Sequence, residues 1–300
     1  MQRRSFSILL LSLAVASSAF AWGEGGHLMT NEAATLSLPT DMPHFFYRAF
    51  PQLVWLGPDP DRWRNAGESI ESVNPPDHFL DYEYVAQLQL PNQRYRFIDL
   101  LHSSGTLRRY GISTATAGFL PWRVAEVSDR LTGEWRQWRF SKPNTTERRA
   151  IEADIIHDAG ILGHYVGDSA QPMHATLNYN GWIMPNPNGY VNDCEIHARF
   201  ERDFVSHAIA ISDVVPLVAA PEKRTDYFAT ELAFVRASNA LVERVYAIDR
   251  DGGFDTLRPV DAKAKRFTAE RIAAGASLLR DLWWSTWLNS ALPPKRVTTE

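Results

Sequence analysis

The chain contains a single cysteine, Cys194, among its 300 residues. One thiol cannot form an intrachain disulfide, so the fold has to be stabilised by a hydrophobic core and by any bound metal. Basic residues are also few, because 31 Lys and Arg face 35 Asp and Glu and leave a formal net charge of −4. This balance does not provide the basic surface with which proteins grip long nucleic acids. The sequence therefore excludes a disulfide scaffold and argues against an electrostatic nucleic-acid binder.

The apolar run near the start of the chain is too short for a membrane anchor. It covers residues 8–16, whereas about 20 residues are needed to cross a bilayer. It follows two arginines and precedes Ser17-Ser18-Ala19-Phe20-Ala21, whose small residues are typical of a signal-peptidase site. We expect residues 1–21 to be a cleaved signal peptide, the protein to be periplasmic or secreted, and the mature chain to begin at Trp22. The paired arginines also fit the twin-arginine export route.

Alternation of apolar and polar residues is scarce, and residues 82–90 form the only candidate strand. Hydrophobic residues make up 45% of the chain and aromatic residues 12%, which is enough for a sizeable core. Asn144 followed by Glu147 predicts a helix cap. We expect residues 22–300 to form one all-α domain, a helical bundle with long loops near a site. The expected helices cover residues 122–140, 145–167, 196–211, 225–247 and 261–289, and the expected loops residues 57–76 and 180–192.

Two pairs of potential metal ligands stand out. His164 and Asp168 are four residues apart, so on a helix they share one face and can grip one cation. His197 and Glu201 repeat this spacing, and His174 lies between the pairs. Nitrogen and oxygen donors without thiolates suit zinc best, with manganese or iron as alternatives. A single pair of this kind is more often a surface hydrogen bond than a metal site. For two pairs with a histidine between them the two interpretations are balanced, and spacing alone does not decide between them.

The residues around these pairs resemble a known superfamily. His164-Tyr165-Val166-Gly167-Asp168, followed by Gln171-Pro172-Met173-His174-Ala175, is similar to the central motif of the three-zinc superfamily. That superfamily contains bacterial phospholipase C and the zinc-dependent single-strand nucleases that are also 3′-nucleotidases. His197-Ala198-Arg199-Phe200-Glu201 resembles the second metal motif in its phospholipase C form, whereas the nucleases usually carry Asp at the position of Glu201.

Three further segments resemble the superfamily in the expected order along the chain. Trp22-Gly23-Glu24-Gly25-Gly26-His27 is similar to its mature amino terminus, in the version that the nucleases have. Asp61-Arg62-Trp63-Arg64 resembles an Asp-x-x-Arg element of the nucleases, and Asp77-His78-Phe79-Leu80-Asp81 resembles an element shared by both branches. The likeness covers residues 22 to about 205, with a looser likeness at 269–283, and implies a helical fold around a trinuclear site.

The resemblance implies three zinc ions per chain. Asp168 would bridge two of them, and Trp22 would bind through its free amino nitrogen and its carbonyl oxygen, which become a chelate only after the preceding peptide bond is cut. The three implied ligand sets are Asp61, His78, His164 and Asp168; Trp22, His27 and Asp168; and His174, His197 and Glu201.

The implied chemistry is attack of zinc-activated water on a phosphodiester. Arg64 would stabilise the negative charge of the transition state, and Asp61 is a candidate proton acceptor as well as a ligand. Phe79 and Asp81 are the candidate substrate-binding residues. Among the other groups, His157 is the best reserve ligand, and Cys194 is expected to be a buried packing residue.

Three functions are compatible with the sequence. Glu201 and the absence of disulfides favour a phospholipase C-type phosphodiesterase, to which we give slight preference. Arg64 and the short spacing from Trp22 to His27 favour a single-strand nuclease or 3′-nucleotidase. A non-enzymatic helical protein with structural zinc is the third. The expected partners are a small or lipid phosphodiester, or single-stranded nucleic acid and nucleotides, with no stable membrane anchor and no obligate protein partner.

Overall fold

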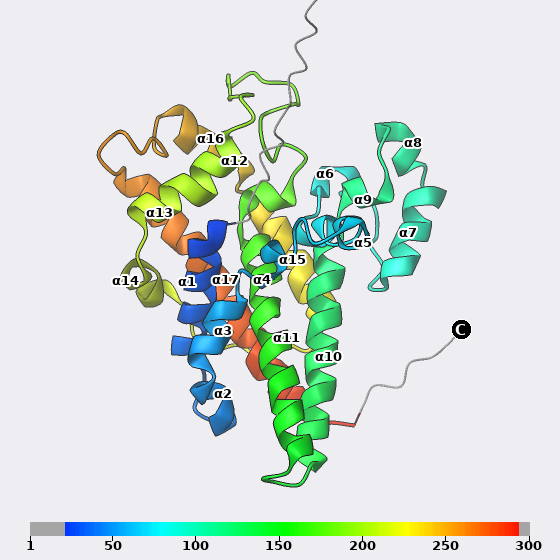
Figure 1. Ribbon diagram of the computed structural model, residues 1–300. Coiled ribbons are helices and arrows are strands. Elements are labelled where there is room, and N and C mark those ends of the chain that lie inside the picture. Colours follow the sequence, from blue (N-terminus) through cyan, green and yellow to red (C-terminus); the bar gives the residue numbers. More distant parts are fainter. Residues whose placement is uncertain (1–21, 294–300) are drawn as a thin grey trace, which may run out of the picture.

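The computed structural model describes residues 22–293, and in that part of the chain it is all-α. The only strand-like pairing within these residues is an isolated antiparallel bridge between Leu80 and Gly118. The expected all-α class is therefore confirmed (Figure 1). The helices in chain order are α1 (Gly23–Leu36), α2 (His44–Arg48), α3 (Phe50–Leu56), α4 (Asp59–Arg62), α5 (Glu68–Glu71), η1 (Pro75–His78), α6 (Tyr82–Val85), α7 (Arg94–Ser103), α8 (Thr106–Tyr110), α9 (Thr114–Ala117), α10 (Leu120–Phe140), α11 (Thr146–Ala170), η2 (Pro172–Ala175), α12 (Ile196–Ala198), the π-helix η3 (Arg199–Phe204), α13 (Val205–Ala208), α14 (Ile211–Val214), η4 (Val215–Leu217), α15 (Tyr227–Asn239), α16 (Val242–Arg250) and α17 (Ala262–Asn289).

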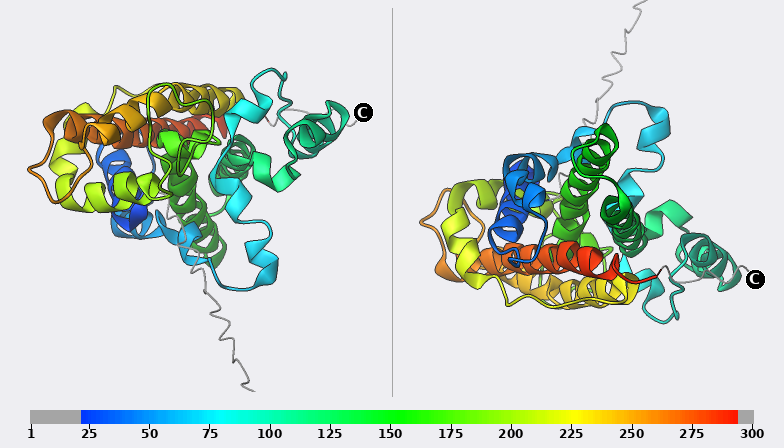
Figure 2. Two further views of the ribbon diagram at one scale, coloured as in Figure 1. Left: turned by 90° about the horizontal axis from the view of Figure 1, so that it is seen from above. Right: turned by 90° about the horizontal axis from the view of Figure 1, so that it is seen from below.

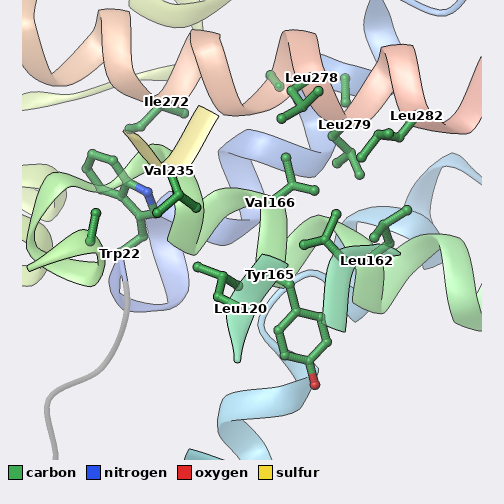
Figure 3. Packing of buried hydrophobic residues seen from close by; sticks show 14 of the residues in the cluster. Trp22, Leu120, Leu162, Tyr165, Val166, Val235, Ile272, Leu278, Leu279 and Leu282 are labelled. Carbon is green, nitrogen blue, oxygen red and sulfur yellow. The ribbon is translucent and has the colours of Figure 1, made fainter. Parts of the chain in front are cut away.

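Helix α11 runs through the middle of the bundle. Views from above and below show α1 on one side of it, α10 on the other, and α15 and α17 along a third side (Figure 2). Every residue from 158 to 170 is buried, so this half of α11 has no solvent face. Leu162 and Val166 of α11 face Leu279 and Leu282 of α17 across the core (Figure 3). A helix enclosed in this way holds its polar side chains inside the protein, where they need partners.

Local capping groups set where the long helices begin. The Thr145 hydroxyl accepts a hydrogen bond from the Arg148 backbone nitrogen at 3.1 Å, and α11 starts at the next residue. The expected cap at Asn144 is therefore wrong by one residue, because Asn144 has a left-handed φ of 63° and lies ahead of the helix. Asp261 caps α17 at the residue where the sequence predicts its start, accepting from Lys263 and Ala264 backbone nitrogens at 2.9 and 2.8 Å.

Other expected elements differ in detail. Residues 82–90 are not a strand, since α6 occupies their first half. The helix expected over 225–247 is divided at Ala240 into α15 and α16, and next to the break the Asn239 side chain donates to Ala175 O at 2.8 Å. The helix expected over 196–211 ends at Ala208 and contains the π turn of η3. Residues 57–76 include the short helices α4 and α5, whereas 180–192 is a loop.

Within residues 22–293, no helix combines the length and the apolar character that crossing a membrane requires. The expected signal peptide, residues 1–21, lies outside the described residues.

Candidate metal centre

Eight histidine and carboxylate side chains from seven elements converge at one end of the bundle. They come from segments up to 174 positions apart in the chain and are all buried, with exposed fractions of 7% or less. Their ligand atoms form three groups in which every atom lies within 4.8 Å of the others. We call His78, His164 and Asp168 the first cluster, His27, Asp61 and His164 the second cluster, and His174, His197 and Glu201 the third cluster.

The first cluster brings together the two residues of the i, i+4 pair on α11 and His78 of η1. Asp168 Oδ2 lies 3.1 Å from His78 Nδ1 and 3.4 Å from His164 Nε2. Asp61 Oδ1 of α4 is 3.9 and 3.8 Å from the same two nitrogens. All four residues of the first implied ligand set therefore lie around one point.

Asp168 connects this group to His27 of α1. Its Oδ1 atom lies 3.4 Å from His27 Nε2, while its Oδ2 atom faces His78 and His164. The two oxygens of one carboxylate thus point to different imidazoles, which is the arrangement that a carboxylate bridging two cations needs. His27 and His164 also stack, with ring centroids 3.9 Å apart.

The third cluster is formed by η2, α12 and the π-helix η3. His197 Nε2 lies 2.8 Å from Glu201 Oε2 and 3.2 Å from His174 Nε2. Ligand atoms on a tetrahedron with zinc bonds of about 2.0–2.1 Å lie roughly 3.3 Å apart, so these separations fit one zinc ion. The i, i+4 spacing of His197 and Glu201 is retained, and the pair therefore shares one face as expected.

Backbone carbonyl groups orient two of the imidazoles. His164 donates from Nδ1 to Gly57 O at 3.0 Å, and His174 donates from Nδ1 to His78 O at 2.7 Å. Because a carbonyl oxygen can only accept, each ring keeps its proton on Nδ1 and presents the lone pair of Nε2 to its cluster. Such bonds fix both the tautomer and the direction of a metal-binding histidine.

Protonation at the site also suits cation binding. Burial lowers the pKa of His27, His78 and His164 well below the usual value, so these rings stay neutral. Burial, reinforced by the negative charges of Asp61 and Glu201, raises the pKa of Asp168 well above the usual value. A cation among these groups would remove the repulsion that disfavours the ionised form of Asp168.

Several polar atoms of the clusters make no hydrogen bond within residues 22–293, although they are buried. They include both ring nitrogens of His27, Nε2 of His78, both oxygens of Asp168 and one oxygen of Glu201. Buried polar atoms of this kind cost free energy unless something binds them. Bound metal ions would satisfy them, and the donor set of imidazole and carboxylate suits zinc.

Trp22 lies against the third cluster. Its main-chain nitrogen is 3.0 Å from Glu201 Oε2, and its carbonyl oxygen accepts from Gly26 N at 3.1 Å in the first turn of α1. The resemblance implies that both atoms bind the same ion as His27 and Asp168. In the structure the nitrogen instead lies beside Glu201, a residue of the third cluster. The buried indole is held by a hydrogen bond from Nε1 to Gly167 O at 2.6 Å. A Cβ at Gly26 would come within 2.7 Å of the Trp22 side chain, so a larger residue does not fit there.

A pocket of about 340 Å³ opens beside the clusters. The Arg64 guanidinium is fixed at its edge by two hydrogen bonds to Asp61 Oδ1, at 2.9 and 2.7 Å. The lining residues are Arg64, Pro75, His78, Phe79, Asp81, Thr116, Met173, His174, Tyr179 and His197.

Phe79 and Asp81 reach this pocket because residues 79–81 are extended. Leu80 between them is fully buried, donates from its nitrogen to His174 O at 3.0 Å, and pairs with Gly118. Alternation along the extended segment turns the two flanking side chains away from the core and into the pocket. Burial and the negative charge of Glu83 raise the pKa of Asp81 to about 8, so its carboxyl group is neutral at pH 7.

Gln171 and Glu83 support the site, although neither was predicted to have a role there. Gln171 is fully buried, donates from Nε2 to Glu201 Oε2 at 2.9 Å and accepts from Met173 N. Glu83 accepts from the Thr176 hydroxyl at 2.6 Å and from Leu177 N at 3.0 Å. The position of Gln171, three residues before His174, was the one feature of the sequence that could have indicated its role.

One secondary expectation, the burial of Cys194, is not met. Cys194 is exposed, in a left-handed loop conformation with φ 59°, and is not the buried packing residue expected from its type. His157 belongs to none of the three clusters, and its ring lies 3.2 Å from Asp158 on the part of α11 nearer its start. Trp182 and Tyr190 of the following loop pack on each other, with ring centroids 4.8 Å apart, and neither lines the pocket.

Comparison of the chain with protein-family models and with curated proteins gives no match. The functional argument therefore rests on the site itself: three buried triads of histidine, aspartate and glutamate that could hold metal ions.

Proposed function

We propose that this protein is an exported zinc-dependent phosphodiesterase with three zinc ions per chain. The observation that carries the proposal is the convergence of three nitrogen- and oxygen-donor triads, with unpartnered buried ligand atoms, on the wall of a pocket that also holds a guanidinium group. A purely structural zinc site would need neither the pocket nor Arg64 at its edge. Zinc bound here would lower the pKa of water toward neutrality and polarise a phosphoryl oxygen.

The residues of the chain would divide the remaining work. Arg64 presents several donors to one side of the pocket, where they can bind phosphoryl oxygens as negative charge develops. Asp61 holds Arg64 in place through Oδ1 and is also a ligand candidate, which makes it a weaker candidate for a proton acceptor. His174 and His197 of the third cluster and His78 of the first cluster lie on the pocket wall, so ions in both clusters would face a bound phosphate.

We favour a phospholipid as the substrate, in a phospholipase C-type reaction that releases a diglyceride and a phosphomonoester. A pocket of about 340 Å³ accommodates a headgroup and its phosphate but not acyl chains, which would stay outside. Residues 176–192, which begin beside the pocket, contain no lysine or arginine that could pair with the successive phosphate groups of a nucleic acid.

A single-strand nuclease or 3′-nucleotidase is the second candidate, favoured by one observation. The neutral Asp81 carboxyl group can donate and accept hydrogen bonds at once, and it lines the same pocket as the aromatic ring of Phe79. This combination suits the edge and the face of a nucleobase.

The test uses the mature protein, starting at Trp22, on phosphatidylcholine, single-stranded DNA, 3′-nucleotides and a chromogenic phosphodiester. We expect three zinc ions per chain by metal analysis, loss of hydrolysis on chelation, and its return with zinc. Cleavage of nucleic acid or nucleotides without cleavage of lipid would replace the first candidate by the second. Fewer than two zinc ions per chain would contradict the proposal, and saturated zinc without hydrolysis of any of these substrates would leave a structural role.

A further inference from the structure

The loop that joins η2 to α12 is unusual in composition. Residues 176–192, which we call the 176–192 loop, contain no aspartate, glutamate, lysine, arginine or histidine. Large apolar side chains are nevertheless exposed on it: Tyr179 is 50%, Ile183 63% and Met184 45% exposed. In Figure 1 the loop projects above α12, at the opposite end of the molecule from the turn between α10 and α11. An uncharged projection with an apolar tip is a candidate contact surface.

Three of the five asparagines of the loop make hydrogen bonds to backbone groups of the loop or of the residues just after it. Asn178 Oδ1 accepts from Ile183 N at 3.0 Å, and the Asn186 side chain makes hydrogen bonds of 2.7 and 2.8 Å to the backbone of Tyr190. Asn180 Nδ2 donates to Cys194 O at 2.8 Å. The large side chains that the loop exposes are the apolar and aromatic ones of Tyr179, Ile183 and Met184.

The loop is also held firmly to the bundle. Tyr246 of α16 donates its hydroxyl hydrogen to Asn178 O at 2.6 Å and accepts from Gly181 N at 3.0 Å. The rings of Trp182 and Tyr190 pack on Tyr246, with centroids 5.1 and 5.4 Å from it. Because these aromatic residues anchor the base of the loop, the exposed side chains of Ile183 and Met184 lie on an ordered tip.

The tip is continuous with the pocket. Tyr179 lines the pocket, and its ring centroid lies 6.1 Å from that of His197 in the third cluster. Ile183 and Met184 follow it by four and five residues. A surface on which this tip settles would therefore lie at the mouth of the site.

We propose that the tip of the 176–192 loop, formed by Tyr179, Ile183 and Met184, docks on a zwitterionic phospholipid surface and so presents the pocket to lipid headgroups. The proposal rests on the phospholipase form of the proposed function. Apolar and aromatic side chains enter the boundary between headgroups and acyl chains, whereas binding to anionic lipids or to nucleic acid needs cations, and this loop has none.

The experiment compares the mature wild-type protein with the double variant Ile183→Ser/Met184→Ser and with Phe140→Ser. Phe140 is 84% exposed at the end of α10, away from the loop, and so controls for the loss of an exposed apolar side chain. Binding is measured by sedimentation with sucrose-loaded phosphatidylcholine vesicles, and hydrolysis with short-chain phosphatidylcholine kept below its micelle concentration. We expect the double variant to bind vesicles about tenfold more weakly or worse, and Phe140→Ser to bind normally. Hydrolysis of the monomeric lipid should not change.

Equal vesicle binding by the double variant and the wild type would overturn the docking proposal. The proposal would also be overturned if the double variant kept its vesicle binding but lost binding to a single-stranded oligothymidylate. Wild-type binding that falls steeply with salt would also contradict it, because an uncharged tip predicts little salt dependence. The two proposals fail separately. Absence of lipid hydrolysis in the wild type refutes the phospholipase function, whereas normal hydrolysis with undiminished vesicle binding in the variant refutes only the docking surface.

Discussion

The main-chain nitrogen of Trp22 lies 3.0 Å from the Glu201 carboxylate, 179 positions further along the chain. When Trp22 follows another residue, this nitrogen is an amide with one hydrogen to donate. When Trp22 is the first residue, it becomes an amine whose lone pair can bind a cation that Glu201 also binds. The contact therefore ties the chemistry of the chain start to the third cluster.

We predict that one extra glycine ahead of Trp22 lowers both zinc content and activity. The extended chain keeps an amide at this position and loses one nitrogen ligand, so one zinc ion should be retained less tightly and kcat should fall about tenfold or more. Metal analysis after dialysis and steady-state rates check this. The same glycine added after Glu300 is the control. Full zinc content and full activity in the extended chain would argue that Trp22 is no ligand.

Gln171 is predicted to position Glu201. Its Nε2 donates to Glu201 Oε2 at 2.9 Å while its oxygen accepts from Met173 N in the segment that carries His174. Gln171→Met keeps the volume and removes both hydrogen bonds, and zinc affinity should fall by about 10- to 100-fold, as is usual for residues that orient ligands.

Competition with a calibrated chelator measures the affinity change in Gln171→Met, and it should be confined to one of the three zinc ions. Gln137→Met, at an exposed position on α10, is the control for the same substitution away from the site and should bind zinc normally. A uniform loss of all three ions would instead indicate a general loss of folding.

Arg64→Met should separate catalysis from metal binding. The guanidinium group contacts Asp61 and lines the pocket but supplies no ligand atom to any cluster. We expect kcat to fall about 10²- to 10³-fold with zinc content unchanged, because the lost donors act on charge that develops in the reaction. Arg62→Met, two residues away and paired with Glu24, should have little effect. A rate within threefold of the wild type would remove Arg64 from the mechanism.

Glu231 should make stability depend on pH. Burial raises the pKa of this α15 carboxyl group to about 8 against the opposing effect of the Ser169 hydroxyl, whereas 4.5 is its ordinary value. Between these pH values the native state keeps a proton that the unfolded state loses. The free energy of unfolding therefore decreases as pH rises through this window, by about 1.4 kcal/mol per pH unit in the limit of one proton.

Glu231→Gln removes this proton equilibrium, and urea unfolding at several pH values between 5 and 8 gives the comparison. The variant should lose less stability than the wild type as pH rises. Parallel curves for the two proteins would show that Glu231 is not protonated in the native state.

The sequence was sufficient to predict those features that depend on interactions between residues close together in the chain. The spacing of His164 and Asp168, and of His197 and Glu201, predicts shared helix faces, and the structure has them. The capping aspartate at the start of α17 is equally local. The long helices could be predicted for the same reason, since each carries its own periodicity and boundary residues.

What could not be predicted depends on contacts between distant segments. The last residue of α15, Asn239, bonds to Ala175, 64 positions away, and nothing in the local pattern of α15 indicates this contact or the break beside it. The role of Glu83 likewise exists only because the 176–192 loop folds against α6. The position of the Trp22 nitrogen beside Glu201 is of the same kind, because it is decided by the packing of α1 against η3.

The enclosure of α11 has a consequence for kinetics. His27, His164 and Asp168 have no exposed surface, whereas His78, His174 and His197 line the pocket. An ion held mainly by His27, His164 and Asp168 can leave only when the surrounding helices open locally, while an ion in the third cluster can leave through the pocket. Exposure to a chelator should therefore remove metal in two phases, a fast one from the third cluster and a slow one limited by the breathing of the bundle.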